Sequence, residues 1–133
     1  MNRIASPSFL RTILLIDAAT CVAMAALLIT AGALIEDWLA IPTRIQHIAV
    51  IILLPFAGFV AYIATRPIQI RGAVWLIIIG NAGWVAASLA LLLIDGAMFN
   101  LTGKAFIAAQ AAAVMLLAEL EFFSLRKSGT VIA

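Results

Sequence analysis

The sequence predicts an all-α integral membrane protein, a four-helix bundle of up-down-up-down topology. Two observations lead to this prediction. Apolar residues make up 66% of the chain and charged residues 11%, with a mean hydropathy of +1.22, whereas soluble domains are near half apolar and a quarter charged. Four apolar stretches, each long enough for the roughly 20 residues that cross a bilayer core, use almost all of the 133 residues as a single domain.

The first predicted span, residues 9–35, carries an acid, Asp17, near its middle. A central Asp costs roughly 2.5 to 3.5 kcal/mol, against about 0.3 to 0.6 gained for each Leu, Ile, Phe or Val. The helix can therefore insert, but we expect Asp17 to face protein and not lipid. Cys21 is the only cysteine in the chain, which excludes an intramolecular disulfide.

The second predicted span, residues 43–65, contains Pro55, which predicts a kink because proline removes one backbone hydrogen bond. His47 follows Gln46 at the start of this span. A metal or haem at His47 would need further His or Cys ligands that the chain does not supply. We interpret it as an interfacial histidine and predict no metal and no cofactor.

The third predicted span, residues 71–94, holds an amide in mid-membrane, Asn81. Asn81, Trp84 and Ser88 fall on one helix face. Beside that face Ala82, Ala86 and Ala90 recur every four residues, a spacing that lets helices approach closely in lipid. We predict that this alanine ridge packs against another helix.

The fourth predicted span, residues 104–126, is alanine-rich at first and acidic near its end. Thr102 is a candidate N-cap for its helix. Glu119 and Glu121 are two residues apart, hence about 200° apart on a helix, so they cannot both face the same neighbour. One should face the bundle and the other the membrane interface, and the spacing leaves open which does which.

The basic residues predict the orientation. Counted over four spans, six fall on the side of the two termini, and two, Arg44 and Lys104, on the other. The six are Arg3, Arg11, Arg66, Arg71, Arg126 and Lys127. By the positive-inside rule both termini are cytoplasmic, in a bacterial inner membrane.

Three polar side chains lie at similar depth in this arrangement. At 1.5 Å of rise per residue, Asp17 lies roughly 13 Å, Glu119 roughly 10 Å and Asn81 roughly 15 Å from the cytoplasmic face. Asp17 and Glu119 could then meet and share a proton, as in a proton relay. The structural alternative is that Asp17 bonds to Asn81 or a backbone carbonyl and holds helices together, while both glutamates reach the interface.

Certain stretches carry a resemblance to known membrane proteins. They are WLAIP after the first span, LLPFAGFVAYIATRP in the second and GNAGWVAASLALLL in the third. With the basic start, they resemble uncharacterised four-span bacterial inner-membrane proteins, which implies no activity. In size, span number and the place of Asp17 the chain is also similar to the small multidrug resistance transporters, although the aromatic motifs of their later spans are not found here.

The sequence shows no catalytic constellation, such as a nucleophile with a base, and no basic patch for nucleic acid. We expect a non-enzymatic accessory or oligomer-forming membrane component. Its partners would be membrane lipids and either further copies of itself or another membrane protein. The alternative is an oligomeric proton-coupled small-molecule transporter or channel that uses Asp17. Its candidate polar site is Asp17, Asn81 and Glu119.

Overall fold

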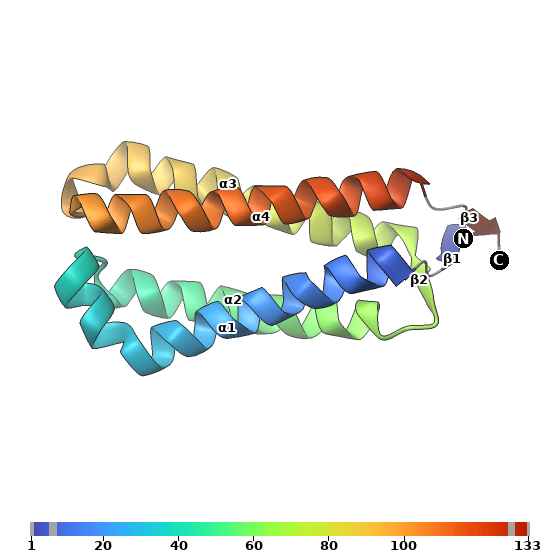
Figure 1. The fold of residues 1–133 in the computed structure, drawn as a ribbon, viewed down its shortest axis with the longest axis horizontal. Helices are drawn as coiled ribbons and strands as arrows, with labels where there is room; N and C mark the ends of the chain where they lie inside the picture. The colour runs from blue at the N-terminus through green and yellow to red at the C-terminus, as the bar shows by residue number, and fades with distance from the viewer. Residues whose placement is uncertain (1, 6–7, 128–129, 133) are drawn as a thin grey trace.

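Four long helices make up most of the protein. The computed structural model describes residues 2–5, 8–127 and 130–132. The helices are α1 (Ser8–Leu39), α2 (Thr43–Ala64), α3 (Arg71–Asp95) and α4 (Leu101–Lys127) (Figure 1). Each is long and apolar enough to span a membrane, which agrees with the predicted multi-pass membrane protein. α1 continues past the predicted end at Ile35, and α4 begins before the predicted start at Lys104.

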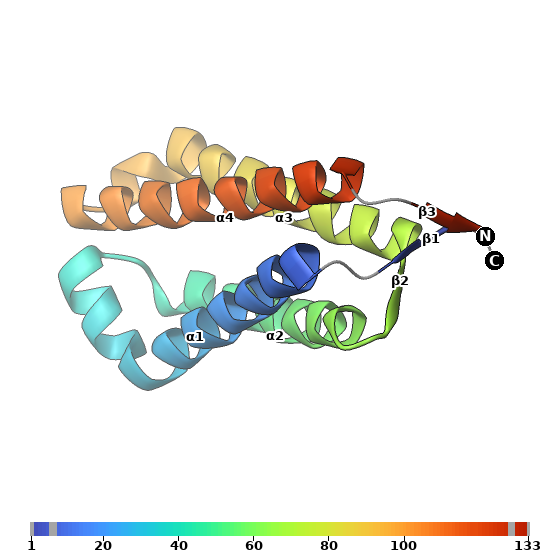
Figure 2. The same cartoon turned by 45° about the vertical axis from the view of Figure 1, so that its right-hand side comes forward.

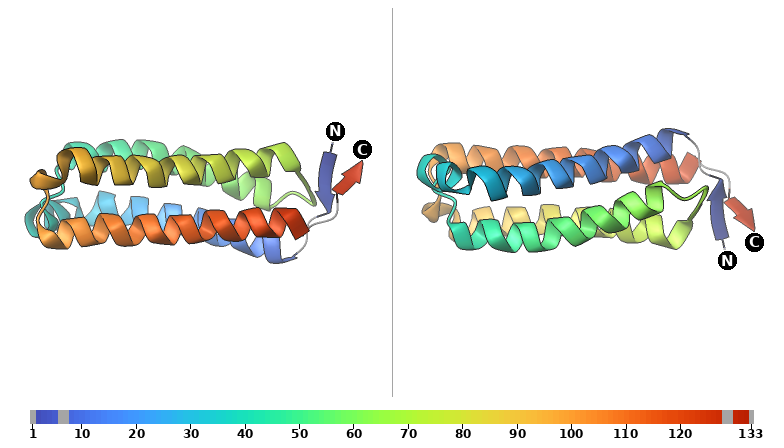
Figure 3. Two further views of the ribbon diagram at one scale, coloured as in Figure 1. Left: turned by 90° about the horizontal axis from the view of Figure 1, so that it is seen from above. Right: turned by 90° about the horizontal axis from the view of Figure 1, so that it is seen from below.

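The helices pair into two hairpins, α1 with α2 and α3 with α4. Each hairpin packs along its length, and the two hairpins meet mainly through α1 and α4, whereas α2 and α3 make little contact (Figures 1 and 3). The interior is therefore divided between a seam shared by α1 and α4 and a more open region between α2 and α3.

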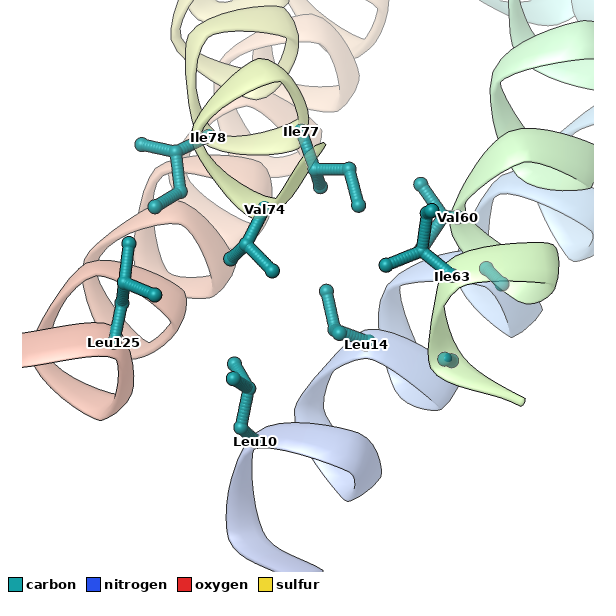
Figure 4. Packing of buried hydrophobic residues seen from close by; sticks show 10 residues of the cluster. Leu10, Leu14, Val60, Ile63, Val74, Ile77, Ile78 and Leu125 are labelled. Carbon is teal, nitrogen blue, oxygen red and sulfur yellow. The ribbon is translucent and has the colours of Figure 1, made fainter. Parts of the chain in front are cut away.

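At the end of the bundle that holds the termini, the four helices converge on one apolar cluster. Figure 4 shows Leu10 and Leu14 of α1 facing Val60 of α2, Val74 of α3 and Leu125 of α4. All five side chains are fully buried. Burying a Leu or Val side chain is worth about 1.5 to 3 kcal/mol in water, but in lipid the gain from such contacts comes from close packing. This cluster closes the bundle at this end.

Three short strands lie beyond this cluster, at the end of the molecule where both termini are found (Figure 2). β1 (Asn2–Ala5) lies between β2 (Ile68–Ile70) and β3 (Thr130–Ile132), antiparallel to both. These strands were not predicted from the sequence, which indicated helices alone. The strands pair the two termini with the α2–α3 connection, so this sheet also joins segments that are far apart in the chain.

At the opposite end, side chains that precede a helix in the chain cap its first turn. Glu36 accepts a hydrogen bond from the backbone N–H of Thr43, the first residue of α2 (2.7 Å). Asn100 follows the short 3-10 helix η1 (Gly96–Met98) and accepts from Gly103 N–H (2.8 Å). It also donates to the carbonyl of Trp38 (2.7 Å), which ties the two hairpins together. Asn100, and not the predicted Thr102, is the N-cap of α4.

The regular helical geometry of α1 is interrupted at Ala31, whose φ/ψ of −117°/20° is not helical, and Figure 2 shows the resulting bend. Gln46 of α2 donates from Nε2 to the carbonyls of Gly32 (3.0 Å) and Ile41 (2.9 Å). A buried amide thus satisfies backbone groups beside the kink. α2 itself continues through Pro55 without a break, so the interrupted helix is not the one in which the sequence predicted a kink.

The predicted alanine ridge on α3 does not pack inside the chain. Ala82, Ala86 and Ala90 are all exposed, while Asn81, Val85 and Ser88 of the same helix are buried. Both faces of α3 contain small residues, and the polar side chains at 81 and 88 decide which of them turns inward. The ridge is therefore left on the outer surface of this chain.

Candidate functional site

Three polar side chains from three helices meet in the middle of the bundle. Asp17 of α1, Asn81 of α3 and Glu121 of α4 are 1%, 3% and 0% exposed. Each lies on the buried stripe of its helix, one turn from members of the apolar cluster. A polar group costs little here only if it is hydrogen-bonded.

The amide of Asn81 joins the two acids. Its Nδ2 donates to Oδ2 of Asp17 (2.7 Å) and to Oε1 of Glu121 (2.9 Å). Asp17 belongs to the first hairpin, while Asn81 and Glu121 belong to the second. One nitrogen therefore connects the hairpins in the buried interior.

Glu121, and not Glu119, occupies the place beside Asp17 that the sequence analysis gave to Glu119. Glu119 is exposed, two residues away and nearly on the opposite side of α4. Depth along the helix does not separate the two acids, since both lie near the same level. The rotation of α4, which turns Leu117, Ala118 and Leu125 inward, decides between them.

Acceptors outnumber donors in this cluster. The four carboxyl oxygens of Asp17 and Glu121 receive the two N–H groups of Asn81 and a weak contact from the thiol of Cys21 (Sγ to Oδ1 of Asp17, 3.8 Å). Oε2 of Glu121 is buried and accepts no hydrogen bond in the described part of the chain. The two carboxyl groups lie close together, because both accept a hydrogen bond from the same amide nitrogen. A proton on one of them supplies the missing donor.

Two like charges held by one amide nitrogen inside an apolar bundle repel each other, and each loses its hydration. Adding one proton removes the repulsion and creates an O–H···O⁻ hydrogen bond, one of the strongest types in proteins. The arrangement can therefore hold a proton and, once hydrated or rearranged, release it.

A second group of polar side chains lies nearer the end of the bundle that holds the α1–α2 and α3–α4 connections. Trp84 donates from Nε1 to Oε1 of Gln110 (2.7 Å), and Gln110 donates from Nε2 to Ser88 Oγ (3.0 Å) and to the carbonyl of Ile107 (3.0 Å). The hydroxyl of Ser88 donates to the carbonyl of Trp84 (2.8 Å). Trp84 and Ser88 were predicted to share one face of their helix, whereas Gln110 was not among the predicted site residues. A lone amide in an alanine-rich span was the signal that could have identified it.

Basic side chains near the termini cap helix ends. Arg11 donates to the carbonyl of Arg66, just beyond α2 (2.8 Å), and Arg71 to that of Leu125 in the last turn of α4 (3.4 Å). Cations are favourable at a helix C-terminus, where carbonyls are left without partners. The side chain of Arg3 lies outside the residues whose side chains are described. His47, at the other end, is exposed on α2.

Comparison with protein-family models, with curated proteins and with solved structures found no match.

Proposed function

We propose that this protein is a proton-linked membrane transporter or channel component in which Asp17, Asn81 and Glu121 form the proton-binding site. The observation that carries the proposal is the buried carboxyl pair held by one amide nitrogen, with a carboxyl oxygen left without a donor. A cluster serving only to join helices is better satisfied by neutral amides, since an unpaired buried carboxylate is expensive. Acids within membrane spans typically belong to proton or ion pathways.

The proposed setting is a bacterial inner membrane crossed in an up-down-up-down manner, with both termini in the cytoplasm. The excess of basic residues at the ends of the chain and in the α2–α3 connection supports this orientation. The proton site then lies in the cytoplasmic half of the membrane. Its burial means that protons reach it only when the hairpins move or water enters, as transport by alternating access requires.

Purified protein in lipid vesicles with an imposed pH gradient tests the proposal. Proton uptake would be followed with an internal pH dye. We expect Asp17→Asn and Glu121→Gln to abolish uptake, because each removes a titratable group while keeping the shape of the side chain. Glu119→Gln is the matched control, since it removes an exposed acid of the same helix.

Infrared difference spectra on changing pH would report the cluster directly. A protonated carboxyl band that disappears in both Asp17→Asn and Glu121→Gln, but persists in Glu119→Gln, is expected. A pair that stays ionised throughout, or uptake that survives both substitutions, would contradict the proposal.

The second candidate is an oligomer-forming accessory protein, which the small residues on the outer surface favour. Ala82, Ala86 and Ala90 lie exposed on α3, and a groove between α1 and α2 is lined by small residues, among them Ala19 and Gly58. Small residues on a lipid-facing surface allow close helix association. If Ala86→Leu reduces the oligomer size in detergent but leaves proton uptake intact, assembly and transport are separate properties.

A further inference from the structure

A cavity of about 300 Å³ lies between the hairpins, in the half of the bundle that holds the α1–α2 and α3–α4 connections. Ile45, Ile48 and Ile52 line it from α2, and Trp84, Ala87 and Leu91 from α3. Its rim is open, because Ile48, Ile52 and Ala87 are themselves exposed. The cavity occupies the region where α2 and α3 make little contact, so its mouth faces the surrounding lipid.

The lining contains no charged side chain. An ion inside this cavity would lose its hydration without gaining a counter-charge, at a cost that excludes it. The aliphatic and aromatic walls instead favour an uncharged apolar molecule. A volume of about 300 Å³ is at the lower end of the range for small-molecule sites.

The polar part of the wall has hydrogen-bond acceptors to offer and no donors. Every N–H and O–H of the Trp84, Gln110 and Ser88 group is already used: indole to amide oxygen, amide nitrogen to Ser88 and Ile107, and hydroxyl to the Trp84 carbonyl. Lone pairs remain on Ser88 Oγ and Gln110 Oε1, since each oxygen accepts only one of these bonds. Ser88 and Gln110 both line the cavity, and so does Gln46. The amide nitrogen of Gln46 donates to the carbonyls of Gly32 and Ile41, and its Oε1 accepts no hydrogen bond in the described part of the chain. A ligand that complements this wall must therefore donate a hydrogen bond.

We infer that the cavity is a binding site for an uncharged apolar molecule bearing one hydrogen-bond donor, of the chemical class of a long-chain alcohol, which enters from the membrane. The apolar part would lie against α2 and α3, and the hydroxyl would donate to Ser88 or Gln110. This inference is independent of the proton-binding site, because neither Asp17 nor Glu121 lines the cavity.

Trp84 provides a direct test, since bromine atoms quench indole fluorescence at short range. Trp38 and Trp75 lie outside the cavity lining and would be replaced by Phe, leaving Trp84 as the reporter. The protein, in vesicles of unbrominated phosphatidylcholine, would be titrated with a bromine-terminated long-chain alcohol and with its methyl ether. We expect saturable quenching by the alcohol and about tenfold weaker binding of the ether, which lacks the donor.

Adjacent alanines supply matched variants. Ala87 lines the cavity and Ala86 does not, although both are exposed on α3. Ala87→Phe should abolish saturable quenching and Ala86→Phe should preserve it; Ala49→Phe, on the α2 wall, replaces Ala87→Phe if that variant fails to fold. Asp17→Asn should bind the alcohol as the parent does, whatever its effect on proton uptake.

Ser88→Ala should reduce the preference for the alcohol over the ether, because it removes one of the acceptors in the cavity wall. Equal, non-saturating quenching by alcohol, ether and lipid with brominated chains would mean that bulk hydrocarbon fills the cavity, and would overturn the inference. Saturable quenching that is unchanged in both Ala87→Phe and Ala49→Phe would overturn it as well, by placing the ligand elsewhere.

Discussion

Asn81 is the residue on which the buried interior depends most, because its single amide nitrogen serves carboxyl groups from both hairpins. Removing one partner of a buried network leaves the others unsatisfied, and the unsatisfied group costs more than the lost bond was worth. The same reasoning makes Asp17 and Glu121 both dependent on Asn81, whose amide is the donor that they share.

Replacing Asn81 by Leu should destabilise the protein by at least about 2 kcal/mol, because two buried carboxyl groups lose their common donor. Unfolding by SDS titration in mixed micelles would measure the effect. A double-mutant cycle with Asp17→Asn should show coupling of about 0.5 to 3 kcal/mol, as found for residues in one network. Additive effects of the two substitutions would mean that Asn81 and Asp17 act separately.

Gly103 is required by the close approach of α4 to the end of α1. A Cβ at this position would lie 2.0 Å from the backbone oxygen of Leu39, whereas a Cβ at Gly83 would meet nothing within 4 Å. Gly103→Ala should cost about 1 to 3 kcal/mol, as overpacking does. Gly83→Ala should be neutral or stabilising by up to about 1 kcal/mol, because alanine favours the helix. Thermal unfolding in detergent compares the two.

At the scale of helices, ends and bends are held by side chains that come from neighbouring elements. Arg11 and Arg71 cap the ends of α2 and α4, Glu36 caps the start of α2, and Gln46 supports the kink in α1. Terminal backbone groups need such partners wherever water does not reach them. Helix boundaries in this protein thus depend on contacts between helices.

Asn100→Ala should destabilise the protein by about 1 kcal/mol, the usual cost of losing an N-cap, and further through the lost bond to Trp38. Thr102→Ala is the matched control, since Thr102 is exposed and lies inside the first turn of α4. Hydrogen exchange of the first-turn amides of α4 would locate the change. Equal effects of the two substitutions would argue against Asn100 as the cap.

At the scale of the whole molecule, the bundle is closed at one end and partly open at the other. The apolar cluster and the sheet join all parts of the chain at the end of the termini. Beyond the carboxyl pair, α2 and α3 separate around the cavity. A hinge motion of one hairpin against the other would then change the opening most at the cavity and least at the sheet.

Orientation in the membrane can be tested with single cysteines in a Cys21→Ala background. Ile68 and Met98 are 42% and 41% exposed at opposite ends of the bundle. With cytoplasmic termini, an impermeant maleimide added to intact cells should label Met98→Cys but not Ile68→Cys, which should react only after the membrane is opened. Labelling of Ile68→Cys in intact cells would reverse the proposed orientation.

The sequence by itself predicted the class of the protein and the approximate positions of its long helices. Hydropathy and length are properties of each stretch alone, so four long apolar helices could be predicted before any contact was known. It also predicted that Asp17 turns inward, because a charged side chain in a span is costly against lipid, and Asp17 is 1% exposed. These predictions needed only the preference of each side chain for lipid or for water, and the period of the α-helix.

Only the tertiary structure decided which glutamate lies beside Asp17 and Asn81. Glu119 and Glu121 have similar depth and chemistry, and the choice depends on the rotation of α4, which many weak packing contacts set together. The same holds for the alanine ridge, where two faces of α3 offered small residues and one was left outside. The kink at Ala31 and the sheet likewise depend on partners distant in the chain, which no local pattern encodes.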